Sequence, residues 1–132
     1  MDSQPRFIII DDDELNNKIC TISIQKALKH ADIKSFSDPV AGFEYIAHEY
    51  SKTNYDTPTV LLLDLTMPVM DGWEFLKRFA LLDTAIKKQV SIYILSSSED
   101  KRDMEKAMAD EHVVNYLIKP LNKISLEIIT GN

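Results

Sequence analysis

Side chains that could do chemistry follow four short apolar runs of the sequence. Three aspartates, residues 11–13, come directly after RFIII, and Asp64 comes directly after TVLLL. Three serines, residues 96–98, follow SIYIL, and Lys119 follows VVNYLI. Carboxylates can hold a cation or act as nucleophiles. What these groups can do together therefore depends on whether the fold brings them to one place.

Carboxylates gathered in one place would need a positive partner. Two of them about 5 Å apart repel by roughly 3 kcal/mol at an effective dielectric of about 20. Lys119 could supply one positive charge, and Mg²⁺ suits a site of a few carboxylates and waters. A carboxylate beside Mg²⁺ and a lysine is arranged for phosphoryl transfer, with the carboxylate as the nucleophile that forms an acyl phosphate.

A zinc site is disfavoured by the positions of the other common ligands. The chain has one cysteine, Cys20, and three scattered histidines, His30, His48 and His112. None of them shows the Cys/His spacing that structural or catalytic zinc requires.

Short apolar runs alternate with helix-like segments along the whole chain. Strands are predicted over 6–10, 33–36, 59–63, 91–95 and 113–118. Helices are predicted over 14–30, 39–50, 73–82, from a cap at 98–100 to about 108, and over 122–129. Strands joined by helical crossovers pair in parallel and carry helices on both faces. The expected fold class is therefore α/β, with a doubly wound five-stranded parallel sheet whose site lies outside the carboxyl ends of the strands.

Two of these helices show apolar residues at helical spacing. In the first they are Leu15, Ile19 and Ile22, with Cys20, Ile24 and Ala27 beside them. The second is expected to begin with Asp38 as N-cap and Pro39 at the first helical position. Its inner stripe is predicted to contain Val40, Phe43, Ala47 and Tyr50.

Composition narrows the function classes. The chain has 132 residues, 45% apolar and 27% charged, with a net charge of −6, which favours one ordinary globular domain. No basic block indicates a nucleic-acid surface, and no apolar run is long enough to span a membrane. The N-terminal stretch has too few apolar residues for a signal peptide, and a lone cysteine suits a reducing compartment. A cytoplasmic protein is the expectation.

Four motifs, taken in order, resemble a known family. IIIDDDELNN, LLLDLTMPVMDGWEFL, YILSSSED and NYLIKP are similar to the motifs of the receiver domain of two-component response regulators, of which the chemotaxis regulator is a single-domain example. The resemblance covers about residues 6–129. It implies a flavodoxin-like (βα)5 fold with strand order 2-1-3-4-5 and one receiver domain over residues 1–132.

The resemblance also implies a role for each acid near the predicted sheet edge. Asp64 matches the phospho-acceptor aspartate. Asp11 and Asp12 match the acidic pair that holds Mg²⁺, which Mn²⁺ can replace, with Asp12 as the direct ligand and Asp11 acting mainly through water. The main-chain carbonyl of Thr66 would be a further ligand. Asp13 is not assigned to the site and is expected to place charge at the start of the first helix.

The remaining motif positions match the groups that contact the phosphoryl group and the side chain that changes conformation when it is bound. Ser96 matches the hydroxyl that meets it, and Lys119 matches the lysine that pairs with it. Tyr116 matches the aromatic side chain whose rotamer follows activation. Pro120 is expected to follow a cis peptide bond, as in the family, and Gly72 to supply a backbone angle that other residues resist.

The function implied is a phosphoacceptor in a two-component phosphorelay. A sensor histidine kinase or histidine phosphotransfer protein would supply the phosphoryl group to Asp64. The domain would not be an enzyme in the usual sense, although it takes part in its own phosphorylation and slow autodephosphorylation. Its output would pass to an unidentified protein through the face formed by the helix ending near 108, the strand 113–118 and the helix 122–129, with Met104, Met108 and Val113 on that face.

The same residues bear on three other functions. A phosphatase of the haloacid dehalogenase type needs a second aspartate two residues after its nucleophile, where this chain has Thr66. A flavodoxin-like electron carrier needs a phosphate-binding loop after the first strand, and DDDELNN would repel a phosphate. An inactive receiver that binds partners without phosphorylation stays open, although all the site positions are chemically intact.

Three features depart from the usual family pattern. The stretch EYSKTNYDTP before the third strand is long, so the end of the second helix is uncertain. ADEHVVNY lacks the common Gly-Ala before the last strand, and Ser97 stands where Ala or Gly is usual.

Overall fold

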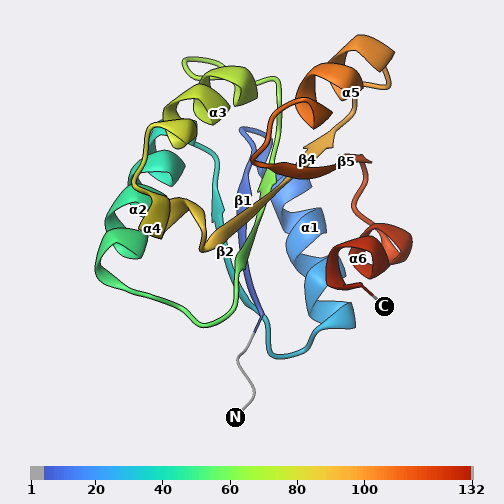
Figure 1. Ribbon diagram of the computed structural model, residues 1–132. Coiled ribbons are helices and arrows are strands. Elements are labelled where there is room, and N and C mark those ends of the chain that lie inside the picture. Colours follow the sequence, from blue (N-terminus) through green and yellow to red (C-terminus); the bar gives the residue numbers. More distant parts are fainter. Residues whose placement is uncertain (1–4, 132) are drawn as a thin grey trace.

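Five parallel strands form one sheet at the centre of the molecule. The computed structural model describes residues 5–131, and Figure 1 shows the sheet between its covering helices. The strands are β1 (Arg6–Ile10), β2 (Asp32–Phe36), β3 (Thr59–Leu63), β4 (Val90–Ser96) and β5 (Val113–Ile118). They pair in the order β2-β1-β3-β4-β5, all in parallel. The predicted α/β class and strand order 2-1-3-4-5 are confirmed.

Within residues 5–131 the structure contains six helices, one more than the sequence predicted. They are α1 (Glu14–Ala27), α2 (Pro39–Lys52), α3 (Gly72–Ala80), α4 (Thr84–Lys87), α5 (Lys101–Met108) and α6 (Lys123–Thr130). The unpredicted helix is α4, a single turn whose Ile86 reaches the core. Within the described part of the chain, no helix has both the length and the apolar character needed to cross a membrane.

Side-chain caps set where most of these helices begin. A carboxylate or amide oxygen accepts backbone N–H bonds from the first turn of five helices, the capping residues being Asp13, Asp38, Asp71, Asp100 and Asn122. Such caps satisfy N–H groups that the helix itself leaves unpaired. The predicted cap and first-position proline of α2 are confirmed, and α2 extends to Lys52.

The sheet separates two layers of apolar side chains. On one face, side chains of β1, β3 and β4 pack with those of α2, α3, α4 and α5. On the other, α1 and α6 cover the sheet through Cys20, Ile24 and Leu126. β3 is almost fully enclosed, with Leu61, Leu62 and Leu63 at most 1% exposed. Asp64 therefore follows a strand that is held from both sides.

The side of α1 that faces the sheet is not its most apolar one. Asn16, Asn17, Cys20 and Ile24 are its buried residues. The predicted stripe points outward, because Leu15 is 65%, Ile19 39% and Ile22 58% exposed. An amphipathic helix normally buries its apolar stripe. Helix α1 does the opposite: it buries two asparagines and exposes its apolar residues.

One buried glutamine organises the long connection before β3. Gln89 is 4% exposed. Its Nε2 donates to the carbonyl oxygens of Tyr50 at 3.0 Å and Ala85 at 2.9 Å, and its Oε1 accepts from the Tyr55 N–H at 2.9 Å. One side chain thus joins the end of α2, the following loop and α4.

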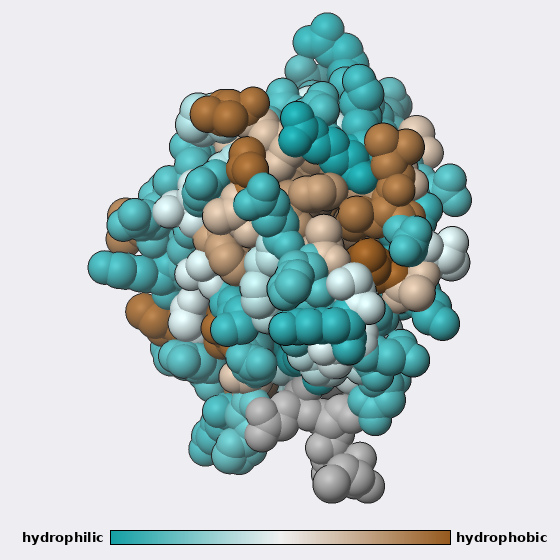
Figure 2. All heavy atoms as spheres, turned by 90° about the vertical axis from the view of Figure 1, so that its left-hand side faces the viewer, coloured by the Kyte–Doolittle hydropathy of each residue, from teal (hydrophilic) through white to brown (hydrophobic). Residues whose placement is uncertain are grey.

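The face formed by α2, α3 and α4 is mixed in character. Figure 2 shows apolar side chains gathered among hydrophilic ones on this side of the molecule. Leu81, at the end of α3, is 86% exposed. This face does not include the polar residues that follow the strands.

Candidate functional site

Four adjacent strands bring the candidate residues to one edge of the sheet. Asp11 follows β1, Asp64 follows β3, Ser96 ends β4 and Lys119 follows β5. Backbone bonds continue the sheet to these positions: the Asp64 N–H donates to the Ile10 carbonyl at 3.0 Å, and the Lys119 N–H donates to the Ser96 carbonyl at 2.9 Å. The rigid strand ends therefore set where the side chains begin.

Asp11 is held by neighbours on the first loop and α1. It is 2% exposed. Its Oδ1 accepts from the Asp13 N–H at 2.9 Å, and its Oδ2 accepts from Asn16 Nδ2 at 2.8 Å. Asn17 Nδ2 donates to the Asp11 carbonyl at 2.9 Å. Of the two buried asparagines of α1, Asn16 thus holds the carboxylate of Asp11 and Asn17 holds its backbone.

The sequence interpretation missed Asn16 and Asn17. The sequence indicates them in only one way, as two neighbouring polar residues in the first turn of a helix that follows an acid at a strand end. Asp13, by contrast, was expected to act only at the helix start. It is the N-cap of α1, and its carboxylate accepts from the Leu15 and Asn16 N–H groups at 3.0 and 3.3 Å.

Lys119 bridges two of the carboxylates. Its Nζ lies 2.6 Å from Asp11 Oδ2 and 3.6 Å from Asp64 Oδ1. Burial lowers the pKa of Lys119, but the hydrogen bond to Asp11 and the charges of Asp64 and Asp11 outweigh it, so the pKa is raised overall. The ammonium group is therefore a permanent positive charge in the site at neutral pH.

Asp64 is an unusually basic carboxylate. It is 7% exposed. Burial and the negative charge of Asp11 raise its pKa to about 6, against the opposing effects of Lys119 and of the Leu65 and Thr66 N–H groups. Both main causes penalise the ionised form. A further cation beside Asp64 would relieve that penalty.

The carboxylates of Asp11, Asp12 and Asp64 form a group that could hold a metal ion. Each can offer one oxygen such that the three oxygens lie within 4.8 Å of one another. Asp11 and Asp64 are buried, whereas Asp12 is exposed at the opening. An all-oxygen donor set with a solvent-facing side is what Mg²⁺ prefers, because it retains several waters. Lys119 alone leaves these three negative charges undercompensated, so the residues fit a divalent cation.

Thr66, predicted to contribute its carbonyl, lies exposed two residues beyond Asp64. Its role as a ligand stays a prediction. No cysteine or histidine joins the group of possible metal ligands found within residues 5–131.

In the loop after Asp64, the residue with the unusual backbone angle is not the one expected. Gly72 was predicted to supply an unusual backbone angle, and this was wrong. A Cβ at Gly72 would lie 2.6 Å from the Asp64 carbonyl oxygen and 2.8 Å from Leu65 Cα, so close backbone approach excludes a side chain. The left-handed residue is Val69, with φ 71°.

Ser96 and Tyr116 meet at one residue of the following loop. Ser96 is 2% exposed, and its Oγ accepts from the Ser98 N–H at 3.0 Å. The half-buried Tyr116 donates its hydroxyl to the Ser98 carbonyl at 2.9 Å. The ring of Tyr116 thus already contacts this loop. Pro120, as expected, follows a cis peptide bond with Lys119.

Comparison with known proteins agrees with this arrangement. The pattern of the response regulator receiver domain matches residues 7–129. A two component response regulator from Cytophaga hutchinsonii superimposes with a TM-score of 0.87 at 27% identity, over 98% of this chain and 96% of the other. A response regulator receiver protein from Dyadobacter fermentans gives 0.82 at 27% identity, over 94% and 93% of the two chains. The fold is also that of the chemotaxis response regulator CheY4 of Vibrio cholerae, with a TM-score of 0.73 at 20% identity over 98% of each chain.

Curated relatives match as parts of longer proteins. The transcriptional regulatory protein HptR of Staphylococcus aureus is 38% identical over 74 residues, which are 56% of this chain and 27% of HptR. The protein-glutamate methylesterase/protein-glutamine glutaminase of Halalkalibacterium halodurans is 28% identical over 134 residues, 97% of this chain and 34% of that protein. This chain therefore spans only about a third or less of these relatives. Since the family pattern covers nearly the whole chain, the protein belongs to the response regulator receiver domain family.

Proposed function

We propose that this chain is a phosphoacceptor receiver, in which Asp64 takes a phosphoryl group from a phosphohistidine and the resulting charge changes a partner-binding surface. The observation that supports this most directly is the contact of Lys119 with both Asp11 and Asp64, at 2.6 and 3.6 Å, beside the exposed carboxylate of Asp12. A nucleophile, a fixed cation and an open metal-binding side are the parts that phosphoryl transfer needs.

In the proposed reaction, an Asp64 oxygen attacks the phosphorus atom and forms the O–P bond. The N–P bond to the donor histidine breaks, and its electron pair returns to the imidazole. Lys119 pairs with an oxygen of the transferred group, and the Ser96 hydroxyl donates to another. When bound, Mg²⁺ would neutralise charge on the phosphoryl oxygens, held by Asp12, Asp64 and the Thr66 carbonyl, with Asp11 acting mainly through water. Mn²⁺ could serve in the same role.

The partner that delivers the phosphoryl group would be a sensor histidine kinase or a histidine phosphotransfer protein. The exposed stripe of α1 provides an apolar surface for it. Leu15, Ile19 and Ile22 run along α1 away from Asp12 and Asp13, so a protein seated on them would be next to Asp64. Exposed apolar residues aligned on one helix face commonly mark a protein contact.

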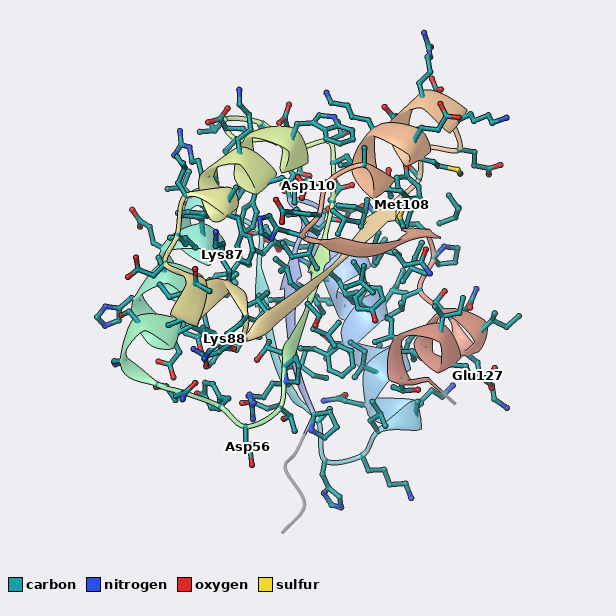
Figure 3. All side chains as sticks on the ribbon, viewed as in Figure 1. Asp56, Lys87, Lys88, Met108, Asp110 and Glu127 are labelled. Carbon is teal, nitrogen blue, oxygen red and sulfur yellow. The ribbon has the colours of Figure 1, made fainter. Side chains whose placement is uncertain are left out.

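The output surface would be the face formed by α5, β5 and α6. Val113 was placed on this face from the sequence, but it is only 7% exposed and belongs to the core. Successive strand residues point to opposite faces, and Val114 is the outward one, 49% exposed. With it, Met108, Ile124 and Ile128 are between 46% and 69% exposed. Figure 3 labels Met108 on α5 and Glu127 on α6, the helices beside β5.

The acyl phosphate is expected to hydrolyse slowly. In the receiver family, the residues two positions beyond the phospho-acceptor and two beyond the hydroxyl that meets the phosphoryl group tune attack by water, and in this chain they are Thr66 and Ser98. Neither carries an acid or amide that would orient that water. Thr66→Asn should therefore shorten the lifetime of the phosphorylated protein, and an unaltered lifetime would contradict this part of the proposal.

The test of the proposed function is the intact mass of the protein after incubation with acetyl phosphate and Mg²⁺. The wild type should gain one phosphoryl group, and Asp64→Asn should gain none while keeping its fold. Asp12→Ala should lose the metal-dependent reaction. Asp13→Asn is the matched control, because it neutralises a neighbouring acid that only caps α1, and it should label as the wild type does.

An outcome without any mass gain in the wild type would favour the alternative, a receiver that binds partners without phosphorylation. Full labelling of Asp64→Asn would place the acceptor at another residue.

A further inference from the structure

Ser98 joins three parts of the molecule through its own hydrogen bonds. Its N–H donates to Ser96 Oγ at 3.0 Å, and its carbonyl accepts from the Tyr116 hydroxyl at 2.9 Å. Its hydroxyl donates to Asp103 Oδ2 at 2.7 Å and accepts from the Asp100 N–H at 3.2 Å. Asp103 lies in the first turn of α5, and Asp100 is the N-cap of that helix. The strand-end site, β5 and α5 are thus linked through one residue.

These bonds can be kept while Ser96 moves. A serine hydroxyl has one donor and two acceptor positions. Ser96 can therefore donate its proton to a phosphoryl oxygen on Asp64 and still accept from the Ser98 N–H. Because that bond persists, a displacement of Ser96 toward Asp64 would pull Ser98, and Ser98 would pull the Asp103 carboxylate with it.

The helix at the other end of this link is lightly held. Of the eight residues of α5, only Ala107 is fully buried. A second tether lies in its last turn, where Lys106 Nζ stands 4.2 Å from the centre of the Trp73 ring on α3. An element with so little buried apolar surface shifts at low cost. Figure 3 shows α5 lying outside the sheet, at the end of the molecule that also carries α3.

We propose that the hydrogen bond between the Ser98 hydroxyl and the Asp103 carboxylate transmits phosphorylation of Asp64 to α5, and that the movement of α5 changes the Trp73–Lys106 contact. Asp103 is a positioning residue in this scheme, since it acts through Ser98 and touches no reacting atom. The inference depends on the proposed phosphorylation of Asp64. It adds a route to α5 that does not pass through Tyr116.

Trp73 makes the proposal measurable, because it is the only tryptophan of the chain. Its fluorescence should change when Lys106→Gln removes the cation beside the ring, which calibrates the signal. Acetyl phosphate and Mg²⁺ should then change the fluorescence of the wild type together with the mass gain. Backbone amide exchange of residues 101–108 provides a second readout of α5.

Two substitutions at Asp103 separate the hydrogen bond from the charge. Asp103→Asn keeps an oxygen that can accept from Ser98 but loses the negative charge that favours a helix start. Asp103→Ala loses both. We expect Asp103→Asn to keep the Trp73 response and Asp103→Ala to reduce it about fivefold, a usual size for coupling between two sites. Both variants should gain the phosphoryl mass, and the exposed Glu105→Gln on the same helix is the control.

Each other outcome overturns the proposal. A full Trp73 response in Asp103→Ala would show that α5 is moved by another route. Loss of the response in both Asp103 variants would assign the effect to charge at the helix start. A wild type that gains phosphate without any change at Trp73 or in α5 exchange would show that α5 does not move. Failure of the wild type to gain phosphate is distinct, because it refutes the proposed function itself.

Discussion

At the carboxyl end of the sheet, Lys119 contacts the carboxylates of Asp11 and Asp64, and Asp12 lies exposed beside them. At the amino end, by contrast, Tyr50, Thr59 and Gln89 have hydrogen-bond partners. There, the Tyr50 hydroxyl lies 2.7 Å from Thr59 Oγ1. Gln89 uses both of its donor hydrogens and its acceptor oxygen. One end of the same sheet therefore carries unbalanced charge, and the other a satisfied network.

The cations at the two ends are used differently. Arg6 Nη2 donates to the Thr57 carbonyl at 2.8 Å, and its guanidinium carbon lies 3.8 Å from the centre of the Tyr55 ring. It thus fastens the loop before β3 onto the first strand. Lys119 instead stands between two carboxylates whose repulsion it only partly offsets. Polar groups that are fully hydrogen-bonded to one another stabilise the fold. Like charges without full compensation lower its stability, and such charges are typical of binding sites.

The largest expected effect of breaking the amino-end network comes from Gln89→Ala. It would leave the Tyr50 and Ala85 carbonyls and the Tyr55 N–H without their partner. An unpaired buried polar group costs about 1–3 kcal/mol. The bond to the Tyr50 carbonyl is buried and the other two are partly buried, so the free energy of unfolding should fall by about 3 kcal/mol. Urea denaturation measures this, with the exposed Gln25→Ala as control. Equal stability of the two variants would show that Gln89 is not structural.

At the carboxyl end, stability should depend on the charge of Asp64. Because its folded pKa is raised to about 6, the folded state holds a proton that the unfolded state releases between about pH 4 and pH 6. With a chelator present to remove metal ions, the free energy of unfolding should therefore be highest, as far as Asp64 is concerned, below pH 4. It should fall by about 3 kcal/mol as the pH rises to 7.

The measurement is the difference in the free energy of unfolding between wild type and Asp64→Asn across that pH range. The wild type should lose stability relative to the variant as the pH rises. A difference that is independent of pH would contradict the raised pKa.

A smaller effect is expected at Val69, in the loop after Asp64. It is 95% exposed, and the Met70 N–H donates to the Pro68 carbonyl at 2.8 Å across it, which closes a γ-turn. A β-branched residue resists positive φ, which asparagine adopts more readily, and the γ-turn with positive φ is strained. Val69→Asn should therefore raise the free energy of unfolding by about 1 kcal/mol. Thermal unfolding tests this, and a loss of stability would show that the turn is not strained.

The smallest expected change is that of Tyr55→Phe at the amino end. The Tyr55 hydroxyl donates to Glu49 Oε2 at 2.7 Å, and this bond is the main reason that the pKa of Glu49 is lowered. The variant should lose about 0.5–1 kcal/mol at pH 7. A lowered carboxyl pKa contributes its full stability above the unfolded pKa and loses it as the pH falls through the folded pKa, so the difference should shrink as the pH falls below the folded pKa of Glu49. A difference that stays the same as the pH falls through this range would assign the effect to packing.

The sequence alone determined the fold class and the location of the site. Runs such as TVLLL and SIYIL are apolar throughout, so they predict strands covered on both faces, and parallel strands place their carboxyl ends at one edge. Asp11, Asp64, Ser96 and Lys119 could be assigned to that edge because each stands next to a run whose type is clear. Caps such as Asp38 were likewise readable, since they act within their own first turn.

Only the tertiary structure decided which residues support the site and the long loop. Asn16, Asn17 and Gln89 look like surface residues in the sequence. The first two are buried against Asp11 at the end of β1, and Gln89 is buried against the distant end of α2. The exposed stripe of α1 and the inward position of Val113 have the same origin, since periodicity shows that a face exists but not which neighbour covers it. Spacing along the chain predicts what a segment forms, whereas burial and hydrogen-bond partners depend on contacts between segments that no local pattern contains.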